Sequence, residues 1–207
     1  MNAQSTQSTQ SAQSTQSTEN GLTPERTELI QVLAEHRGFL LRTAEGLTEE
    51  QARTASTVST LTIASILKHV ADTEEQWMAF AVEGESAFGD SSVYDADVDW
   101  EAVDAEAATN DGDWSGSEWE DDRFTLTDAD TLDALRARLA QVAAGTEEIL
   151  RTVDLDSSHA LPPAPWFEAG TSWSVRRVAM HMLGEISQHA GHADIIREAI
   201  DGQRTMG

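Results

Sequence analysis

The chain has 207 residues, of which 39% are hydrophobic and none is cysteine. This length suits one domain with tails, and the lack of cysteine excludes disulfides, thiolate metal sites and cysteine nucleophiles. The formal net charge of −24, with Lys68 the single lysine, repels phosphate backbones and anionic lipids. We therefore expect no nucleic-acid partner and no membrane partner.

The start of the chain is a polar repeat. Residues 4–18 are five triplets, QST, QST, QSA, QST and QST, which lack the apolar side chains needed to offset the entropy of ordering. We predict a disordered tail at 1–21 and one domain at 22–205. The start lacks the basic and apolar regions of a secretory signal, and no run reaches the roughly 18 apolar residues of a membrane span. We expect a cytoplasmic protein.

Two amphipathic helices are predicted in the first half of the chain. Thr23 and Pro24 form a helix-start signal, and apolar residues then recur at helical spacing. This predicts a helix over about 24–46, ending near Gly46. A second helix is predicted after Thr62, running to about Val82, with Gly84 as its stop signal.

An acidic insertion follows, at about 85–128. Residues 85–130 hold sixteen acidic residues and one arginine, and tryptophans are interspersed without helical or strand periodicity. We predict a long surface crossover that its tryptophans partly order. Asp95, Asp97, Asp99 and Glu106 have EF-hand spacing, but Trp100 stands where that loop needs glycine, which argues against calcium binding.

Two further helices are predicted over about 129–152 and 174–200, with a proline-rich loop at 162–166 between them. The second opens at Ser174 and ends before Gly202. No run alternates with period two, so no sheet is expected. Four amphipathic helices with long links predict an all-α, four-helix bundle.

Polar residues that can ligate a metal cluster on the last helix. His181, Glu185, His189 and His192 fall within an arc of about 80° at about 100° per residue. Three imidazoles and a carboxylate on one face are costly to bury unless they are paired or ligated. Glu and His four residues apart can reach one ion, and His69, between apolar neighbours, is the candidate third ligand. A structural hydrogen-bond network is the alternative.

Two strings in these helices, SILKHVADTEEQW (65–77) and HMLGEISQHAGHADIIREAIDG (181–202), resemble the DinB-like superfamily. They are most similar to its actinobacterial subgroup, which includes mycothiol-dependent maleylpyruvate isomerases and thiol S-transferases. The resemblance covers about 22–205. It implies a four-helix bundle with a mononuclear site, whose metal ligands here are His69, Glu185 and His189. His181 and His192 would then be catalytic groups or substitute ligands, able to orient a ligand or a bound water.

The resemblance implies a metal-dependent enzyme that uses a low-molecular-weight thiol, with mycothiol as a cosubstrate and an S-transfer or an isomerisation as its reaction. The donor set suits Zn, Ni, Fe or Mn. Two alternatives stay open: a metal-dependent hydrolase with His181 or His192 as general base, and a non-catalytic, stress-related metal-binding or interaction module. A small-molecule substrate is expected, and the resemblance also allows a homodimer.

Several other residues have ordinary structural interpretations. Trp77 could line the site, although core packing is the simpler role. Arg176, Arg177 and Arg197 could hold a substrate carboxylate, but with so many acidic residues we expect salt bridges. His36 and His159 have no partner at informative spacing and receive no role.

Overall fold

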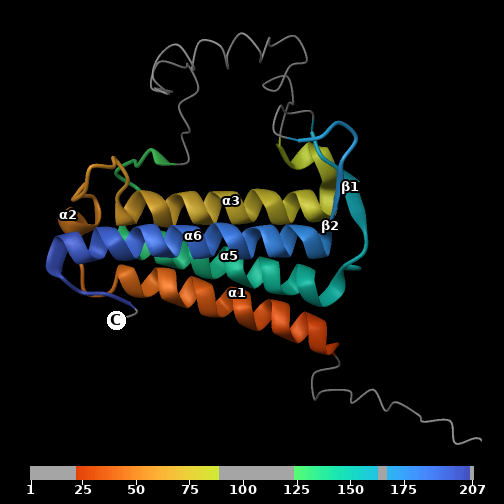
Figure 1. Cartoon of the computed structure of the whole chain (residues 1–207), viewed down its shortest axis with the longest axis horizontal. Coiled ribbons are helices and arrows are strands. Elements are labelled where there is room, and N and C mark those ends of the chain that lie inside the picture. The colour runs from red at the N-terminus through yellow and green to blue at the C-terminus, as the bar shows by residue number, and fades with distance from the viewer. Residues whose placement is uncertain (1–21, 89–123, 163–166, 206–207) are drawn as a thin grey trace, which may run out of the picture.

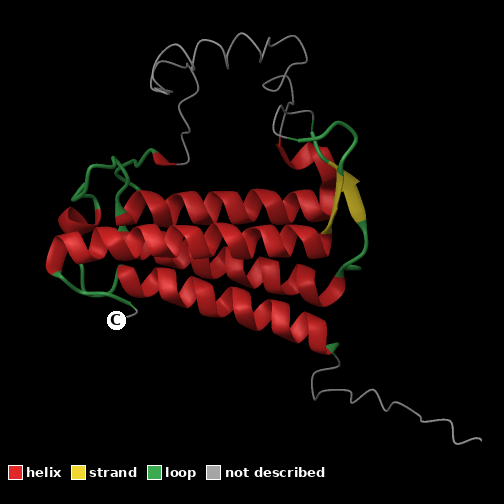
Figure 2. Cartoon of the chain, in the orientation of Figure 1, coloured by secondary structure: helices red, strands yellow, loops and turns green. Residues whose placement is uncertain are grey.

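Four long helices run side by side in the computed structural model, which describes residues 22–88, 124–162 and 167–205 (Figure 1). They are α1 (Pro24–Thr43), α3 (Ile63–Glu83), α5 (Leu132–Thr152) and α6 (Val175–Asp201). The all-α prediction is confirmed (Figure 2). The predicted tail, the central acidic stretch with its EF-hand-like residues, and residues 163–166 lie outside the described part.

Each long helix packs mainly against two others. α6 lies against α1 and α3, and α5 lies against α3 and α1, so that the order around the bundle is α1, α6, α3, α5. One apolar core fills the space between them. Its largest fully buried apolar side chains are Leu33, Leu40, Ile63, Ile66, Leu67, Phe80, Leu135, Leu139, Leu150, Met182 and Ile186.

Local capping explains where most of these helices begin and end. The predicted caps Thr23, Thr62 and Ser174 each accept a hydrogen bond from the backbone three residues ahead. The last helix ends at Gly202, which is left-handed with φ +77°. α5 begins at Leu132, later than predicted, because Thr131 is the cap while Asp130 holds a turn by accepting from Thr127.

The first helix is shorter than predicted, and a short helix follows it. α1 stops at Thr43, and the chain reverses at Gly46, which has φ +73°. Thr48 and Gln51 then form a reciprocal capping box that begins α2 (Glu49–Ala52). The 3-10 helix η1 (Gly84–Phe88) directly follows α3.

The prediction of no sheet is wrong in one place. β1 (Ser158–Ala160) and β2 (Ser172–Ser174) form a two-stranded antiparallel ladder with His159 opposite Trp173. Three residues are too few to produce a visible alternation in the sequence. The ladder packs on the bundle through Trp173, which stacks on Trp77 of α3 with ring centroids 5.0 Å apart.

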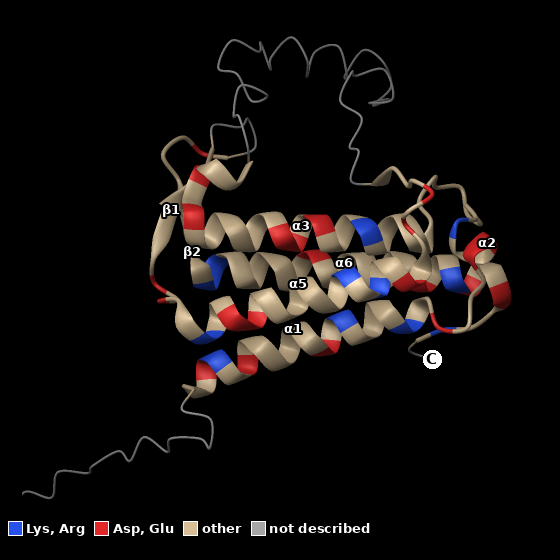
Figure 3. Cartoon of the chain, turned by 180° about the vertical axis from the view of Figure 1, so that it is seen from behind, with Lys and Arg blue, Asp and Glu red and all other residues tan. Residues whose placement is uncertain are grey.

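Polar side chains connect helices that are distant in sequence. Lys68 and Arg138 both contact Asp72 at 2.8 Å, linking α3 to α5. Figure 3 shows charged residues spread along the helices on the face seen from behind. Within the described ranges, no helix is long and apolar enough to cross a membrane.

Candidate metal centre

The three residues predicted to bind a metal lie together between α3 and α6. One potential ligand atom of each of His69, Glu185 and His189 falls within 4.8 Å of the other two. His69 lies in the second turn of α3, while Glu185 and His189 are one turn apart on α6. Residues more than one hundred positions apart in sequence therefore meet at one point.

The local sequence explains why the two helices bring these groups together. His69 lies between the buried residues Leu67 and Val70, so that its side chain faces the interior and is only 6% exposed. On α6, residues four apart share one face, and the buried Ile186 and Ala190 hold that side of the helix against the core. Helix packing, rather than a loop, therefore positions the candidate ligands.

The geometry suits a mononuclear ion. The rings of His69 and His189 have centroids 4.6 Å apart, and the Nε2 of His189 lies 3.7 Å from a carboxylate oxygen of Glu185. Ligands at about 2.1 Å from a zinc ion lie at most about 4.2 Å from one another. Small side-chain rotations would bring the three ligand atoms into that range.

The protonation of the site also fits metal binding. Burial lowers the pKa of His189, while the nearby Glu185 acts to raise it and His192 to lower it. A lowered pKa keeps the imidazole neutral at pH 7, which is the form that ligates metals. The Nδ1 of His189 is buried and makes no hydrogen bond within the described residues. Two imidazoles and one carboxylate form a donor set suited to divalent transition metals.

Sequence reasoning did not identify Phe124, which lies at the end of the acidic insertion. Its ring stacks on that of His69 with centroids 3.9 Å apart and an interplanar angle of 9°. The ring also lies 6.0 Å from His189. Phe124 therefore limits the rotation of His69 and shields this side of the cluster from water. The sequence signal was weak, because a single apolar residue after an acidic stretch has many explanations.

His181 lies one turn before Glu185, with its Nε2 3.9 Å from a carboxylate oxygen of that residue. Trp77 and Trp173 contact its ring edge-on at 4.8 and 5.0 Å. Burial lowers the pKa of His181, which Glu185 acts to raise and Arg177 to lower. Trp77 therefore lies beside the site, as well as packing in the core.

His192 lies on the other side of the cluster. Its ring centroid is 5.6 Å from that of His189, and its Nδ1 is buried without a hydrogen-bond partner in the described residues. It is adjacent to the three candidate ligands but is not one of the group whose ligand atoms converge.

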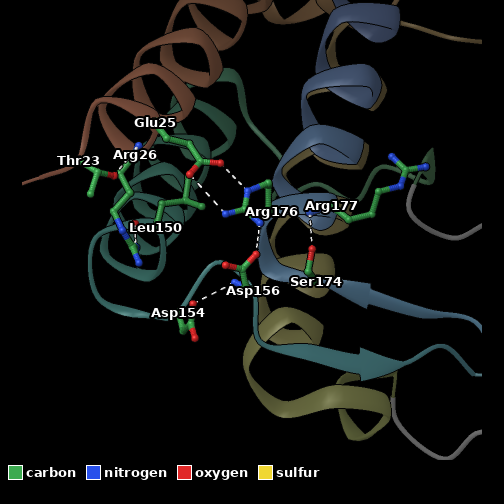
Figure 4. Close-up of polar contacts among 9 residues, drawn as sticks. All are labelled: Thr23, Glu25, Arg26, Leu150, Asp154, Asp156, Ser174, Arg176 and Arg177. Carbon is green, nitrogen blue, oxygen red and sulfur yellow. Dashed lines mark hydrogen bonds and ion pairs between the residues drawn. The ribbon is translucent and has the colours of Figure 1, made fainter. Parts of the chain in front are cut away.

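The remaining candidates lie away from this centre. Arg176 pairs with Glu25 and Asp156 at the start of α6 (Figure 4). Arg197 pairs with Asp201 at 2.9 Å. The expectation of salt bridges is thus confirmed for these two arginines.

Arg177 is different, because its guanidinium lies 4.6 Å from the centre of the Trp173 ring. The two histidines without an assigned role have structural contacts. His36 lies 2.9 Å from the hydroxyl of Ser187, and His159 packs on Phe80 with centroids 6.1 Å apart.

Comparison with known proteins bears out the resemblance in the two helix strings. No curated protein and no solved structure gives a match to this chain. The model of the Mycothiol-S-transferase family, a DinB-like family, matches residues 28–202, which include all four long helices except the first turn of α1. The chain therefore belongs to the mycothiol S-transferase family.

Proposed function

We propose that this protein is a metal-dependent enzyme that transfers the sulfur of mycothiol to a small electrophilic substrate, and that it acts in the cytoplasm. The convergence of His69, Glu185 and His189 at one point is the observation that carries the proposal. The family description supports S-transfer as the reaction, in preference to isomerisation.

The three converging side chains would hold the ion, with Zn, Ni, Fe and Mn as candidates. Three protein ligands leave coordination positions open, which is typical of catalytic rather than structural sites. A bound divalent ion supplies a strong local positive charge that favours the thiolate form of a thiol. Phe124 and the buried ring of His69 keep water from one side of this point.

We assign His181 and His192 to proton handling and orientation. His181 has its Nε2 directed toward Glu185, and two tryptophan rings hold its imidazole. From there it can accept the proton that the thiol S–H group loses when sulfur bonds to the substrate carbon and the leaving group departs with its electron pair. His192 would orient His189 from the opposite side.

The test combines metal content with thiol consumption. The full chain, purified without an affinity tag, is expected to hold about one equivalent of a divalent metal, the stoichiometry of a single three-ligand site. It should consume mycothiol when given a small alkyl halide. Glu185→Ala and His69→Ala should lose both the metal and the activity. His181→Ala should keep the metal and lose most of the turnover.

His159→Ala is the matched control, because it removes a half-buried histidine that lies outside the cluster. It should keep both metal and activity. Turnover that persists without any thiol would favour a metal-dependent hydrolase instead. Bound metal without turnover would favour a non-catalytic binding module. An absence of metal after reconstitution with all four candidate ions would overturn the proposal.

A further inference from the structure

The outer side of α6 carries a narrow exposed stripe. From Arg177 to Glu198, both included, seven residues are exposed, and at about 100° per residue they fall within about 80° of one another. We call them the α6 stripe: Arg177, Met180, Gly184, Gln188, Gly191, Ile195 and Glu198. α6 packs against α1 and α3 on its other sides, and Figure 1 shows it lying between these two helices.

The α6 stripe is unusual for the surface of so acidic a chain. Its central five residues carry no charge, although the chain has a net charge of −24. Met180 and Ile195 are 54% and 63% exposed, and they are two of the four large hydrophobic residues that stand out on the described surface. An added Cβ at Gly184 or Gly191 would meet nothing within 4 Å, so the helix backbone is open to approach there.

The order of residues in the stripe is self-complementary. Measured from a midpoint between Ser187 and Gln188, Met180 and Ile195 are equally distant. The same holds for Gly184 and Gly191, and for Arg177 and Glu198.

An antiparallel second copy of α6, related by a two-fold axis at this midpoint, would oppose methionine to isoleucine, glycine to glycine and arginine to glutamate. Such isologous matching is what a two-fold dimer interface requires. A parallel copy would instead oppose arginine to arginine.

We propose that the α6 stripe is the dimer interface of this protein, and that its partner is a second copy of the same chain packed antiparallel on α6. The two glycines let the helix backbones approach closely. Met180 and Ile195 of each copy bury one another's exposed apolar surface. Arg177 and Glu198 form an ion pair at each end of the interface, which fixes the antiparallel register.

Both end charges are available for this pairing. In Figure 4 the side chain of Arg177 points away from the Arg176 cluster, and it lies over the Trp173 ring at the surface. Glu198 has an ordinary surface contact with Arg204 at 3.6 Å. Arg177 and Glu198 are about 32 Å apart along one helix at about 1.5 Å per residue, so they cannot pair within one chain. Any energetic coupling between them must come from another copy.

Reversing the two end charges, singly and together, tests this interface. Sedimentation of the full chain over a range of concentrations measures the association of each variant. The wild type should dimerise. Arg177→Glu and Glu198→Arg should each weaken association at least about tenfold, because each places like charges opposite one another at both ends of the two-fold interface. The double reversal should restore association to within about threefold of wild type.

A second pair of variants tests the apolar contact. Ile195→Gln should weaken the dimer, whereas Val82→Gln, which removes an exposed apolar side chain of α3 that is not part of the stripe, should not. The proposal is overturned if the wild type stays monomeric at every concentration, if single reversals leave a dimer unchanged, or if the double reversal associates no better than the single ones. Circular dichroism of each variant checks that these surface changes leave the helices intact. None of these results depends on the proposed catalytic function.

Discussion

Arg37 of α1 binds both carboxylate oxygens of Glu74 of α3, with its Nε 2.9 and 3.2 Å from them. Glu74 is fully buried and also accepts a hydrogen bond from Thr146 of α5 at 2.6 Å. One carboxylate therefore joins three of the four long helices. A buried charge of this kind is tolerated only while its partners remain in place.

Glu74→Ala should lower the free energy of unfolding by about 3–5 kcal/mol, because it leaves the Arg37 charge buried and uncompensated. Urea denaturation measures this loss. Glu75→Ala is the matched control, since its neighbouring carboxylate is 58% exposed and pairs with Arg138 at the surface. That change should cost less than about 1 kcal/mol. Equal losses of unfolding free energy in the two variants would show that the buried pair stabilises the fold no more than the exposed pair does.

Phe124→Ala should weaken metal binding about tenfold, as removal of groups that orient a metal ligand commonly does. The physical reason is that the Phe124 ring stacks on His69 at 3.9 Å and limits its rotation. Titration of the apoprotein with zinc measures the affinity. Leu126→Ala removes a half-buried side chain two residues further on and serves as the control. Unchanged zinc affinity in Phe124→Ala would contradict this account.

Gly84→Ala should destabilise the fold more than Gly46→Ala does. Both glycines have positive φ, +75° and +73°, where an L side chain costs about 1–2 kcal/mol, and Gly84 also has ψ −151°, a combination that is essentially confined to glycine. Only at Gly84 would the new Cβ collide with a neighbour, at 2.8 Å from Nδ1 of His159, whereas at Gly46 it meets nothing. Thermal unfolding measures the difference in stability between the two variants. Adding His159→Ala to Gly84→Ala should remove the part of the destabilisation that is due to the collision. Equal destabilisation at the two glycines would contradict a collision between the new Cβ and His159.

The ion pairs of Arg176 should stabilise the protein only above acidic pH. The hydrogen bonds from Arg176 lower the pKa of Glu25 and of Asp156 from their ordinary values of 4.5 and 3.8. A carboxyl whose pKa is lower in the folded state contributes stability above its unfolded pKa and loses it as the pH falls through the folded value. The stability difference between wild type and Arg176→Ala should thus be present at pH 7 and disappear in strong acid.

Urea midpoints at several pH values would show this dependence. Arg42→Ala is the control, because the Arg42 guanidinium lies 4.6 Å from the centre of the Phe39 ring, a group that does not titrate. Its effect should stay nearly constant over the same pH range. If the effect of Arg176→Ala does not change with pH, the ion pairs with Glu25 and Asp156 do not contribute to stability.

The sequence predicted the helices and the proximity of the candidate metal ligands, because both depend largely on local spacing. Thr62 and Ser174 are caps that act within one turn. Glu185 and His189 meet because they are four residues apart on one helix. The third candidate ligand, His69, was found because a histidine between apolar neighbours in a helix is expected to face the interior.

Features that depend on distant parts of the chain were missed. Helical spacing places Glu74, and not Glu75, on the apolar face of α3 with Val70 and Trp77. Its partner Arg37 could not be identified from the sequence, because which cation meets this carboxylate depends on how α1 and α3 pack. Phe124 was missed for the same reason. The late start of α5 is a local error, since Thr127 and Thr131 are both suitable caps and only the turn that Asp130 forms selects between them.

The pairing of Lys68 with Asp72 has a practical consequence for chemical labelling. Lys68 is the only lysine of the sequence, and its side chain is 15% exposed in that ion pair. Amine-directed crosslinkers and lysine-modifying enzymes therefore find a single side chain to react with, one that is mostly shielded and already engaged. Carboxyl-directed reagents, by contrast, have 37 acidic residues in the sequence to choose from. Crosslinking of this protein to itself or to other molecules should be designed around carboxylates rather than amines.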